Sequence, residues 1–553
     1  MNQAKISTAD YLLIRLAELG ITDIFGVPGD YNLTFLDHII AFKNMRWVGN
    51  CNELNAAYAA DGYARVRGAA ALVTTFGVGE LSAINGIAGS FAEYLPVVNI
   101  VGAPSTQLQR EHAIVHHTFG TGDFGVFINM FEHVSAAVVI LNSPEKNAQF
   151  IDHALETCWI KKQPVYISLP SDMVEVQIPV PVKPLNLNYP TSNQDVVAEL
   201  AQRTAALVRQ AKNPIILADL CADRHHMQDL ILDLLKHTNI PFALMNLGKG
   251  IINESHPLFI GLYNGNYSTP GVQERIEHAD CVISFGTMMS DFNTGIFTSK
   301  INENISIEIH SHFVKVQHAL YPNVYFNAVV PALTKALQGY RYSGPIVRPV
   351  RPDVPKPQAF ISQNYFWSTI VDYLKPHDII IAETGTSMFG LLEIPMPDAI
   401  TFVAQALWGS IGYATGALLG TALADTTRRS LLFTGDGSFQ LTAQEVSTML
   451  RHHLTPIIFL LNNQGYTIER VIHGPKMIYN DIQPWQYSAL PAIFGENVYA
   501  VKVTTEGELA AALEASKQHA DQLCFIEVMM KPDDCPESLR KLGKACETNN
   551  KGK

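Results

Sequence analysis

Basic residues are scarce in this sequence, and no run of them stands out. Lys and Arg number 39 against 51 Asp and Glu among 553 residues, which leaves a formal net charge of −12. Proteins that bind a nucleic-acid backbone or an anionic membrane gather positive charge, so we expect neither partner. Charged residues amount to 16% and hydrophobic residues to 47%, which excludes a disordered chain and predicts a folded protein that binds small molecules.

Cysteine is also scarce, and no two cysteines are spaced as Cys-x-x-Cys. The seven that occur are scattered, which excludes the common zinc and redox motifs and fits a reducing compartment. No window approaches about 18 uncharged apolar residues, so we expect no membrane-spanning helix. The N-terminal segment carries Asp10, Arg15 and Glu18 between apolar positions, as an amphipathic helix does and a signal peptide does not. We therefore expect a cytoplasmic protein.

Short apolar runs rich in β-branched residues alternate with helical stretches along the chain. Strands that are apolar throughout and separated by helices are typical of parallel sheets covered on both faces, so the predicted fold class is α/β. The ten expected strands are Ala69–Thr74, Pro96–Val101, Pro164–Leu169, Pro214–Ala218, Cys281–Gly286, Ile305–His310, Ile379–Ala382, Ser430–Thr434, Pro456–Leu461 and Cys524–Val528.

Two proline-rich stretches, 178–194 and 344–358, interrupt this pattern. Proline restricts its own backbone and that of the preceding residue, so such stretches are expected to be extended connectors. A chain of 553 residues is long enough for three or four domains at about 150 residues each. We predict three α/β domains, with limits 1–185, 190–345 and 358–553.

Two oxygen-bearing side chains follow neighbouring strands in the third domain. Asp436 comes after the strand Ser430–Thr434, and Asn463 comes after the strand Pro456–Leu461. Parallel strands end at one edge of a sheet, where open α/β folds bind their ligands, so the two side chains should meet there. A carboxylate, a carboxamide and glycine-rich backbone suit magnesium, whose remaining ligands are water and phosphate oxygens.

The local structure between these strands is also predicted. Gly435-Asp436-Gly437 is expected to form a tight turn. The spacing Thr442-x-x-Glu445 predicts a capping box that opens the following helix.

Taken singly, Gly-Asp-Gly is usually a turn and Asn-Asn a strand terminator. Together, across a strand, a helix and a strand, they resemble the cofactor motif of the thiamine-diphosphate enzymes. The resemblance implies that Asp436, Asn463 and the Gly465 carbonyl hold magnesium, and that Gly437 and Ser438 lie against the diphosphate. A P-loop nucleotide enzyme is disfavoured because the sequence has no Gly-x4-Gly-Lys-[Ser/Thr] motif.

Two loops upstream resemble further parts of that cofactor site. AETGTSMFG is similar to the family loop that contacts the diphosphate, here through Thr384 and Thr386. In LWGSIGYATGA, Ile411 resembles the bulky residue that holds the cofactor bent, and the carbonyl of Gly409 would accept a hydrogen bond from its aminopyrimidine. The alternative for Ile411 is an apolar side chain that only fills a core.

The segment NELNAAYAADGYARVRG predicts a helix with Asn52 as its cap and Glu53 in its first turn. The helix dipole alone favours an acid there by about 0.3–1 kcal/mol, so Glu53 could be purely structural. The small residues between Ala56 and Ala60 would let another surface approach closely. The segment is similar to the one that carries the essential glutamate of 2-oxo-acid decarboxylases, which implies that Glu53 activates the cofactor through its pyrimidine ring.

Four other residues are candidates for proton transfer. Asp30 follows a Pro-Gly turn, His116 and His117 lie in a glycine-rich stretch, and Glu469 follows the Asn-Asn motif. An Asp after Pro-Gly usually serves the turn, and adjacent loop histidines usually face solvent. In the decarboxylases that the chain resembles, these residues line the reaction chamber, where a close Asp and Glu would share a proton.

The resemblance extends over the full length and is closest to the pyruvate, indolepyruvate and branched-chain 2-oxo-acid decarboxylases. It implies three α/β domains, a central one without cofactor, and conversion of a 2-oxo acid to an aldehyde and carbon dioxide with thiamine diphosphate and magnesium. It also implies active sites between the first domain of one subunit and the third of another, hence a homodimer at minimum and commonly a homotetramer.

Two other functions stay open. An acetolactate-synthase-like carboligase shares the glutamate and metal motifs, although it usually needs a flavin and lacks the His-His loop. A non-catalytic diphosphate-binding protein is the other alternative. Phe292, Met388 and Phe389 resemble pocket-lining residues and would narrow the pocket in favour of pyruvate and short aliphatic 2-oxo acids, unless Phe292 packs only inside the central domain.

Overall fold

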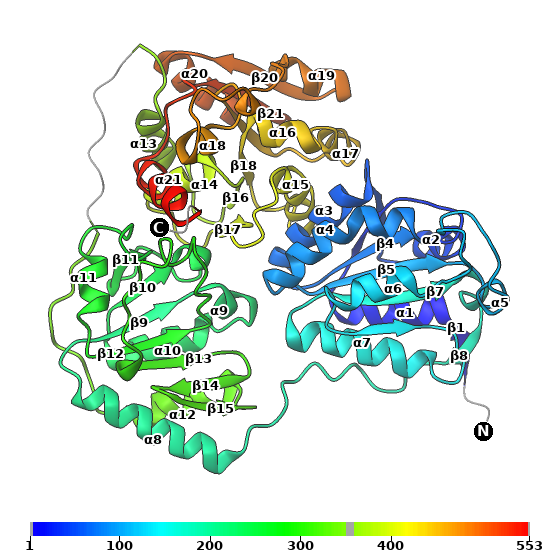
Figure 1. Cartoon of the computed structure of the whole chain (residues 1–553), viewed down its shortest axis with the longest axis horizontal. Coiled ribbons are helices and arrows are strands. Elements are labelled where there is room, and N and C mark those ends of the chain that lie inside the picture. The colour runs from blue at the N-terminus through cyan, green and yellow to red at the C-terminus, as the bar shows by residue number, and fades with distance from the viewer. Residues whose placement is uncertain (1–3, 350–358, 551–553) are drawn as a thin grey trace.

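The computed structural model describes residues 4–349 and 359–550, which form three α/β units around three large sheets (Figure 1). The first sheet has six parallel strands in the order β3-β2-β4-β5-β7-β6. Its strands are β2 (Asp23–Gly26), β3 (Arg46–Gly49), β4 (Ala70–Thr75), β5 (Val97–Ala103), β6 (Val138–Ile140) and β7 (Val165–Pro170). Its helices are α1 (Thr8–Glu18), α2 (Leu33–Ala41), α3 (Glu53–Arg67), α4 (Val78–Ala92), α5 (Thr106–Arg110), α6 (Val126–Glu132) and α7 (Asn147–Lys161).

The third unit repeats the topology of the first. Its sheet is also six-stranded and parallel, in the order β17-β16-β18-β19-β21-β20, so both sheets follow the sequence 2-1-3-4-6-5. Its strands are β16 (Ile379–Ala382), β17 (Thr401–Ala404), β18 (Ser430–Gly435), β19 (Ile457–Asn462), β20 (Val498–Val503) and β21 (Leu523–Met529). Its helices are α13 (Gln363–Tyr373), α14 (Thr386–Glu393), α15 (Tyr413–Ala424), α16 (Asp436–Thr442), α17 (Glu445–Arg451), α18 (Thr467–Ile472), α19 (Leu490–Phe494), α20 (Glu506–Gln518) and α21 (Glu537–Asn550).

The central unit has a different sheet, in the order β11-β10-β9-β12-β13-β14-β15. Its first five strands are parallel and the last two antiparallel. The strands are β9 (Pro214–Ala218), β10 (Phe242–Met245), β11 (Phe259–Tyr263), β12 (Cys281–Phe285), β13 (Ser306–Ile309), β14 (Phe313–Val316) and β15 (Ala319–Pro322). The helices are α8 (Gln194–Gln210), α9 (Leu220–Arg224), α10 (Gln228–Thr238), α11 (Val272–Glu277) and α12 (Phe326–Ala336).

The α/β prediction is confirmed, and all ten expected strands are present within one or two residues at each end. The first proline-rich stretch begins in β8 (Gln177–Pro179), which pairs antiparallel with β1 (Lys5–Ser7), and then runs without helix or strand to α8. In the second stretch, residues 350–358 lie outside the described part of the chain. No helix in the described ranges is long and apolar enough to cross a membrane.

The predicted tight turn and capping box in the third unit are wrong. Asp436 begins α16 directly after β18, and Thr442 ends that helix instead of opening the next one. The Thr442 hydroxyl donates a hydrogen bond to the Gly412 carbonyl, 2.7 Å away. The carboxylate of Glu445 accepts hydrogen bonds from the side chains of Asn50 and Asn55 in the first unit. Both side chains therefore serve tertiary contacts.

The first and third units meet through α3 and α15, which lie side by side in Figure 1. Glycines allow this close approach: a β-carbon on Gly420 would lie 1.8 Å from the Ala59 carbonyl oxygen, and one on Gly62 would lie 2.3 Å from that of Ala417. The expectation that small residues after Glu53 admit another surface is confirmed.

Candidate active site

The carboxyl edge of the third sheet brings three oxygen atoms together. The side-chain oxygen of Asn463 lies 2.8 Å from the Gly465 carbonyl oxygen and 3.1 Å from Oδ1 of Asp436. With the amide turned around, its nitrogen would donate to both oxygens and its oxygen would accept from the Thr467 hydroxyl, 3.0 Å away. The orientation with three oxygens together is the one that a cation between them would hold. Adjacent ligands in an octahedron with bonds of 2.0–2.1 Å are about 3 Å apart, so the spacing fits magnesium.

Asp436 is held in place by backbone groups. Its oxygens accept hydrogen bonds from the N–H groups of Gly437 and Gly465, each at 3.0 Å. Burial raises the pKa of Asp436 to about 6, although these N–H groups oppose the shift. None of these contacts brings a positive charge to the buried carboxylate. A bound cation would supply that charge.

Two helix starts and their loops border the same edge. Gly437 and Ser438 lie in the first turn of α16, and Thr384 and Thr386 flank Gly385 at the start of α14. The strands before them, β16 and β18, are paired neighbours. A β-carbon added at Gly385 or Gly435 would touch no atom, so this backbone borders open space. Free N–H groups at helix starts beside open space form an anion-binding arrangement.

The loop before α15 lies next to these segments. Gly409 and Gly412 have positive φ angles of 64° and 87°, and a β-carbon on Gly409 would touch no atom. Ile411 is half-buried and belongs to none of the apolar clusters formed by the described residues. Ile411 is therefore outside these apolar clusters, and its contact with a cofactor stays a prediction.

Sequence reasoning missed Glu383, which lies between these two loops. Its carboxylate accepts hydrogen bonds from the N–H groups of Thr384, Gly412 and Ala414 at 3.0–3.2 Å. The sequence signal that could have identified Glu383 is an acidic residue directly after the wholly apolar strand β16. Burial raises the pKa of Glu383 to about 7.

Glu53 opens α3 in the first unit, as predicted. The Asn52 side chain caps the helix by accepting a hydrogen bond from the Asn55 N–H at 2.8 Å. The carboxylate of Glu53 reaches the start of α4, where a β-carbon on Gly79 would lie 3.1 Å from its Oε1. Desolvation raises the pKa of Glu53 above the ordinary glutamate value, which suits a group that exchanges a proton.

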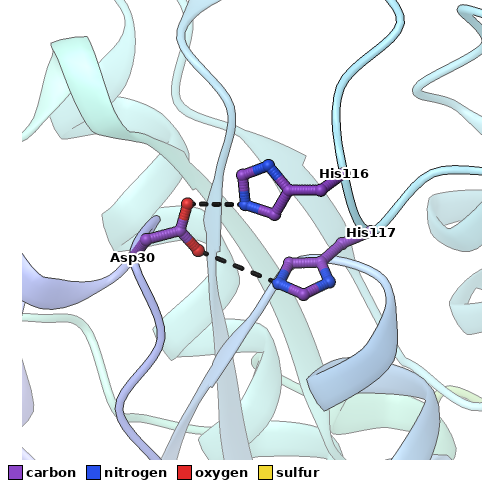
Figure 2. A group of neighbouring side chains, drawn as sticks. All are labelled: Asp30, His116 and His117. Carbon is purple, nitrogen blue, oxygen red and sulfur yellow. Dashed lines mark hydrogen bonds and ion pairs between the residues drawn. The ribbon is translucent and has the colours of Figure 1, made fainter.

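Figure 2 shows that Asp30, His116 and His117 point toward one another. Nε2 of His116 lies 2.7 Å from Oδ2 of Asp30, and Nε2 of His117 lies 3.9 Å from Oδ1. The Tyr31 ring stacks on His116 with centroids 5.0 Å apart. The structure therefore brings three of the four predicted proton-transfer residues together on the exposed side of the first unit.

Glu469, the fourth of these residues, lies elsewhere. It is an exposed residue of α18 in the third unit, whereas Asp30 precedes α2 in the first unit. The two units are joined through α3 and α15, and α2 and α18 lie on separate units in Figure 1. A single chain thus presents the two halves of the predicted chamber on different surfaces.

The three predicted pocket residues line one cavity of about 260 Å³ where the central and third units meet, with Arg65 of the first unit also in its wall. The rings of Phe292 and Phe389 are 6.2 Å apart across this junction, and Met388 lies on the same wall. The Phe292 side chain therefore contacts the third unit as well as its own. Arg65, Arg224 and Lys249 also line the cavity, which gives it a polar side.

Three family models match successive parts of the chain. They are described as the thiamine pyrophosphate enzyme N-terminal TPP binding domain (residues 6–123), central domain (201–333) and C-terminal TPP binding domain (384–528). Thiamine pyrophosphate is another name for thiamine diphosphate, so these matches place the chain in the class of enzymes that use this cofactor.

Curated relatives narrow the class. A pyruvate decarboxylase of Aspergillus fumigatus is 42% identical over 558 aligned residues, covering 99% of this chain and 98% of the relative. Pyruvate decarboxylase of Candida glabrata is 42% identical, with 97% of each chain covered. Isozyme 1 of Saccharomyces cerevisiae is 40% identical, with 99% of each chain covered. The chain belongs to the thiamine-diphosphate-dependent 2-oxo-acid decarboxylases, which are carboxy-lyases.

Proposed function

We propose that this decarboxylase acts on pyruvate, or on another short aliphatic 2-oxo acid, with magnesium as its metal. The observation that carries the proposal is the convergence of Asp436, Asn463 and the Gly465 carbonyl at a spacing that fits an octahedral cation. The printed names of the relatives support pyruvate. The bulky pocket side chains Phe292, Met388 and Phe389 support a small substrate.

The cofactor site is assigned to the segments that border the sheet edge. The metal would be held by Asp436, Asn463 and Gly465. Thiamine diphosphate, when bound, supplies the nucleophilic carbon and the electron sink that loss of carbon dioxide requires. Its diphosphate would be held by Thr384, Thr386, Gly437 and Ser438, and its rings by Gly409, Ile411 and Glu53.

The remaining residues move or hold protons. Glu53 exchanges a proton with the cofactor's pyrimidine ring, and its raised pKa supports this role. Asp30 and His117 protonate and release the product, and His116 positions Asp30 through their 2.7 Å contact. Glu469 acts on the step in which the carboxylate is lost.

The complete site is assigned to a pair of subunits. Exposed apolar side chains occur close in sequence to both half-sites: Val78 precedes Gly79, Phe119 follows His117, Trp408 precedes Gly409, and Leu441 lies in α16. The Trp408 Nε1–H also donates to Asn85 of the first unit at 2.9 Å. Such residues indicate a protein interface. A homodimer would bring Asp30 and Glu469 together, and a homotetramer would pair two dimers. A cytoplasmic location belongs to the same proposal, since all seven cysteines are free thiols.

The experiment measures aldehyde and carbon dioxide from a panel of 2-oxo acids after removal and readdition of thiamine diphosphate and magnesium. Pyruvate, 2-oxoisovalerate, phenylpyruvate and indolepyruvate form the panel. We expect the highest kcat/KM for pyruvate and loss of activity when either addition is omitted. Acetolactate formed in place of aldehyde would instead identify a carboligase.

A further inference from the structure

Glu383 is a carboxylate in an unusual setting. It is only 1% exposed, and no basic side chain among the described residues forms an ion pair with it. Its donors are backbone N–H groups: Thr384 donates to Oε1 at 3.0 Å, and Gly412 and Ala414 donate to Oε2 at 3.1 and 3.2 Å. Burying a charge without a cation is unfavourable, so packing alone gives no reason for an acid here.

The two oxygens contact two different loops. Oε1 binds the start of the loop that contains Thr384 and Thr386, and Oε2 binds the segment that follows Ile411 and opens α15. Both loops contain glycines at positive φ, 127° for Gly385 and 87° for Gly412, and their backbone hydrogen bonds, such as Met388 N–H to the Glu383 carbonyl and Tyr413 N–H to the Ser410 carbonyl, stay within each loop. The Glu383 side chain is one of the groups that join the two loops to each other.

Further hydrogen bonds join the same loops through Gln405. The Thr384 hydroxyl donates to the Gln405 carbonyl at 3.3 Å, and the Gln405 side-chain oxygen accepts from the Ser410 N–H at 3.1 Å. Thr442 holds the Gly412 carbonyl from the other side. Glu383 is the ionisable member of this network, and its carboxylate form accepts stronger hydrogen bonds from the three N–H groups than a neutral side chain would.

We propose that Glu383 is a positioning residue that fixes the loop of Thr384 and Thr386 relative to the loop of Gly409 and Ile411, so that the cofactor meets a preformed site. This inference rests on the proposed assignment of both loops to thiamine diphosphate. A preformed site binds more tightly because the loops lose less conformational freedom on binding. The Glu383 carboxylate contacts none of the metal ligands, and the backbone carbonyl of Glu383 accepts a hydrogen bond from the Met388 N–H at 3.1 Å.

The test uses Glu383→Gln, with Glu393→Gln as the matched control. Glu393 is exposed at the opposite end of α14 and accepts a hydrogen bond from the Ser538 N–H. Glutamine keeps the size of Glu383 but turns an NH₂ group toward backbone N–H donors. We expect the Kd of thiamine diphosphate at saturating magnesium to rise about 10- to 100-fold in Glu383→Gln and to stay unchanged in the control.

Two further measurements separate positioning from a general structural role. The melting temperature without cofactor should stay close to the wild-type value, while its rise on adding thiamine diphosphate and magnesium shrinks. At saturating cofactor, kcat and the KM for the 2-oxo acid should return toward wild type. Glu383→Asp is measured in parallel, because its shorter side chain reaches only one loop and should also weaken cofactor binding.

An unchanged Kd in either folded variant would overturn the proposal. A fall in melting temperature that is equal with and without cofactor would also overturn it, since that result describes a structural residue. If the wild-type protein itself showed no affinity for thiamine diphosphate, the cofactor assignment would fail instead, so the two failures are distinguishable.

Discussion

Glu53 is half-buried at the start of α3, and desolvation raises the pKa of its carboxyl group. Glu53→Gln keeps the shape of the side chain but removes its ability to take up and release a proton. We expect the variant to fold and to bind thiamine diphosphate, while single-turnover aldehyde release falls by at least about 100-fold. Glu132→Gln, an exposed position at the end of α6, is the control. Aldehyde release near the wild-type rate in Glu53→Gln would remove this residue from the mechanism.

The second prediction for a single residue concerns Phe292, whose ring faces Phe389 across the junction of two units. Phe292→Ser should enlarge the pocket and raise kcat/KM for phenylpyruvate and 2-oxoisovalerate relative to pyruvate. A hydrophobic pocket discriminates by about 1–3 kcal/mol per methylene-sized change, so the preference shifts and the reaction stays the same. Phe297→Ser is the control, since Phe297 lies in the same segment and is 63% exposed. Equal ratios in all three proteins would contradict the narrow-pocket argument.

The pairing of α3 with α15 gives a prediction about helices. A β-carbon on Gly420 would lie 1.8 Å from the Ala59 carbonyl oxygen, so Gly420→Ala forces the two helices apart. We expect a loss of about 1–3 kcal/mol in the free energy of unfolding, measured by denaturant titration. Gly507→Ala in α20 is the control: an added β-carbon there meets no atom, so the variant should gain up to about 1 kcal/mol. Equal stabilities for the two variants would show that α15 can move away without cost.

The edge formed by β18 and β19 gives a prediction about ligand binding. Thiamine diphosphate and magnesium together should raise the melting temperature, since a ligand at 100 times its Kd adds about 2.7 kcal/mol to the native state. Asp436→Ala should abolish that rise, because it removes one of three converging oxygens. Asp521→Ala, exposed before β21, should keep it. A rise in Asp436→Ala equal to that of the wild type would count against the metal assignment.

The sequence predicted strands where a short run of residues is largely apolar. The ten expected strands are largely apolar, and all were found. Other strands of the large sheets were missed: β2 and β3 begin with Asp23 and Arg46, which form an ion pair, whereas β10 and β11 are buried and apolar but only four and five residues long. The start of α16 was mistaken for a turn because Gly-Asp-Gly has low helix propensity. The helix forms despite this low propensity, because the chain passes directly from β18 of the sheet into α16.

The candidate site was also predicted only in part from the sequence. Sequence motifs predicted the meeting of Asp436 with Asn463 because both follow neighbouring parallel strands. The trio of Asp30, His116 and His117 was found only through the family resemblance, since its members are 86 and 87 residues apart. Glu383 was missed because its partners at the start of α15 lie about 30 residues further along the chain. Contacts of that separation leave no periodic signal.

At the scale of the molecule, the first and third units share one strand order, and the proposed function assigns one half of the active site to each. The proposed dimer predicts complementation between inactive variants. In a heterodimer of Glu53→Gln and Asp436→Ala subunits, one site of the two combines an intact first unit with an intact third unit. Random pairing of equal amounts should therefore restore about a quarter of the wild-type activity, measured after co-expression.

Sites built within one chain would give the opposite result, because every site would then carry one of the two substitutions. The control is co-expression of Glu53→Gln with a second, differently tagged copy of Glu53→Gln, which should remain inactive in both arrangements.

The domain limits 1–185, 190–345 and 358–553 stay predictions, and the end of the second connector, 350–358, lies outside the described residues.

Because β1 pairs with β8, the two strands can form their sheet only after most of the first unit has been synthesised. Lys5 pairs with Pro179 and Ser7 with Gln177, so the first strand to be synthesised waits for the last strand of its unit. At about 5–20 residues per second, that wait on the ribosome is roughly 10–35 s. During this interval β1 has no partner strand from β8, and its edge is open to chaperones until β8 has emerged.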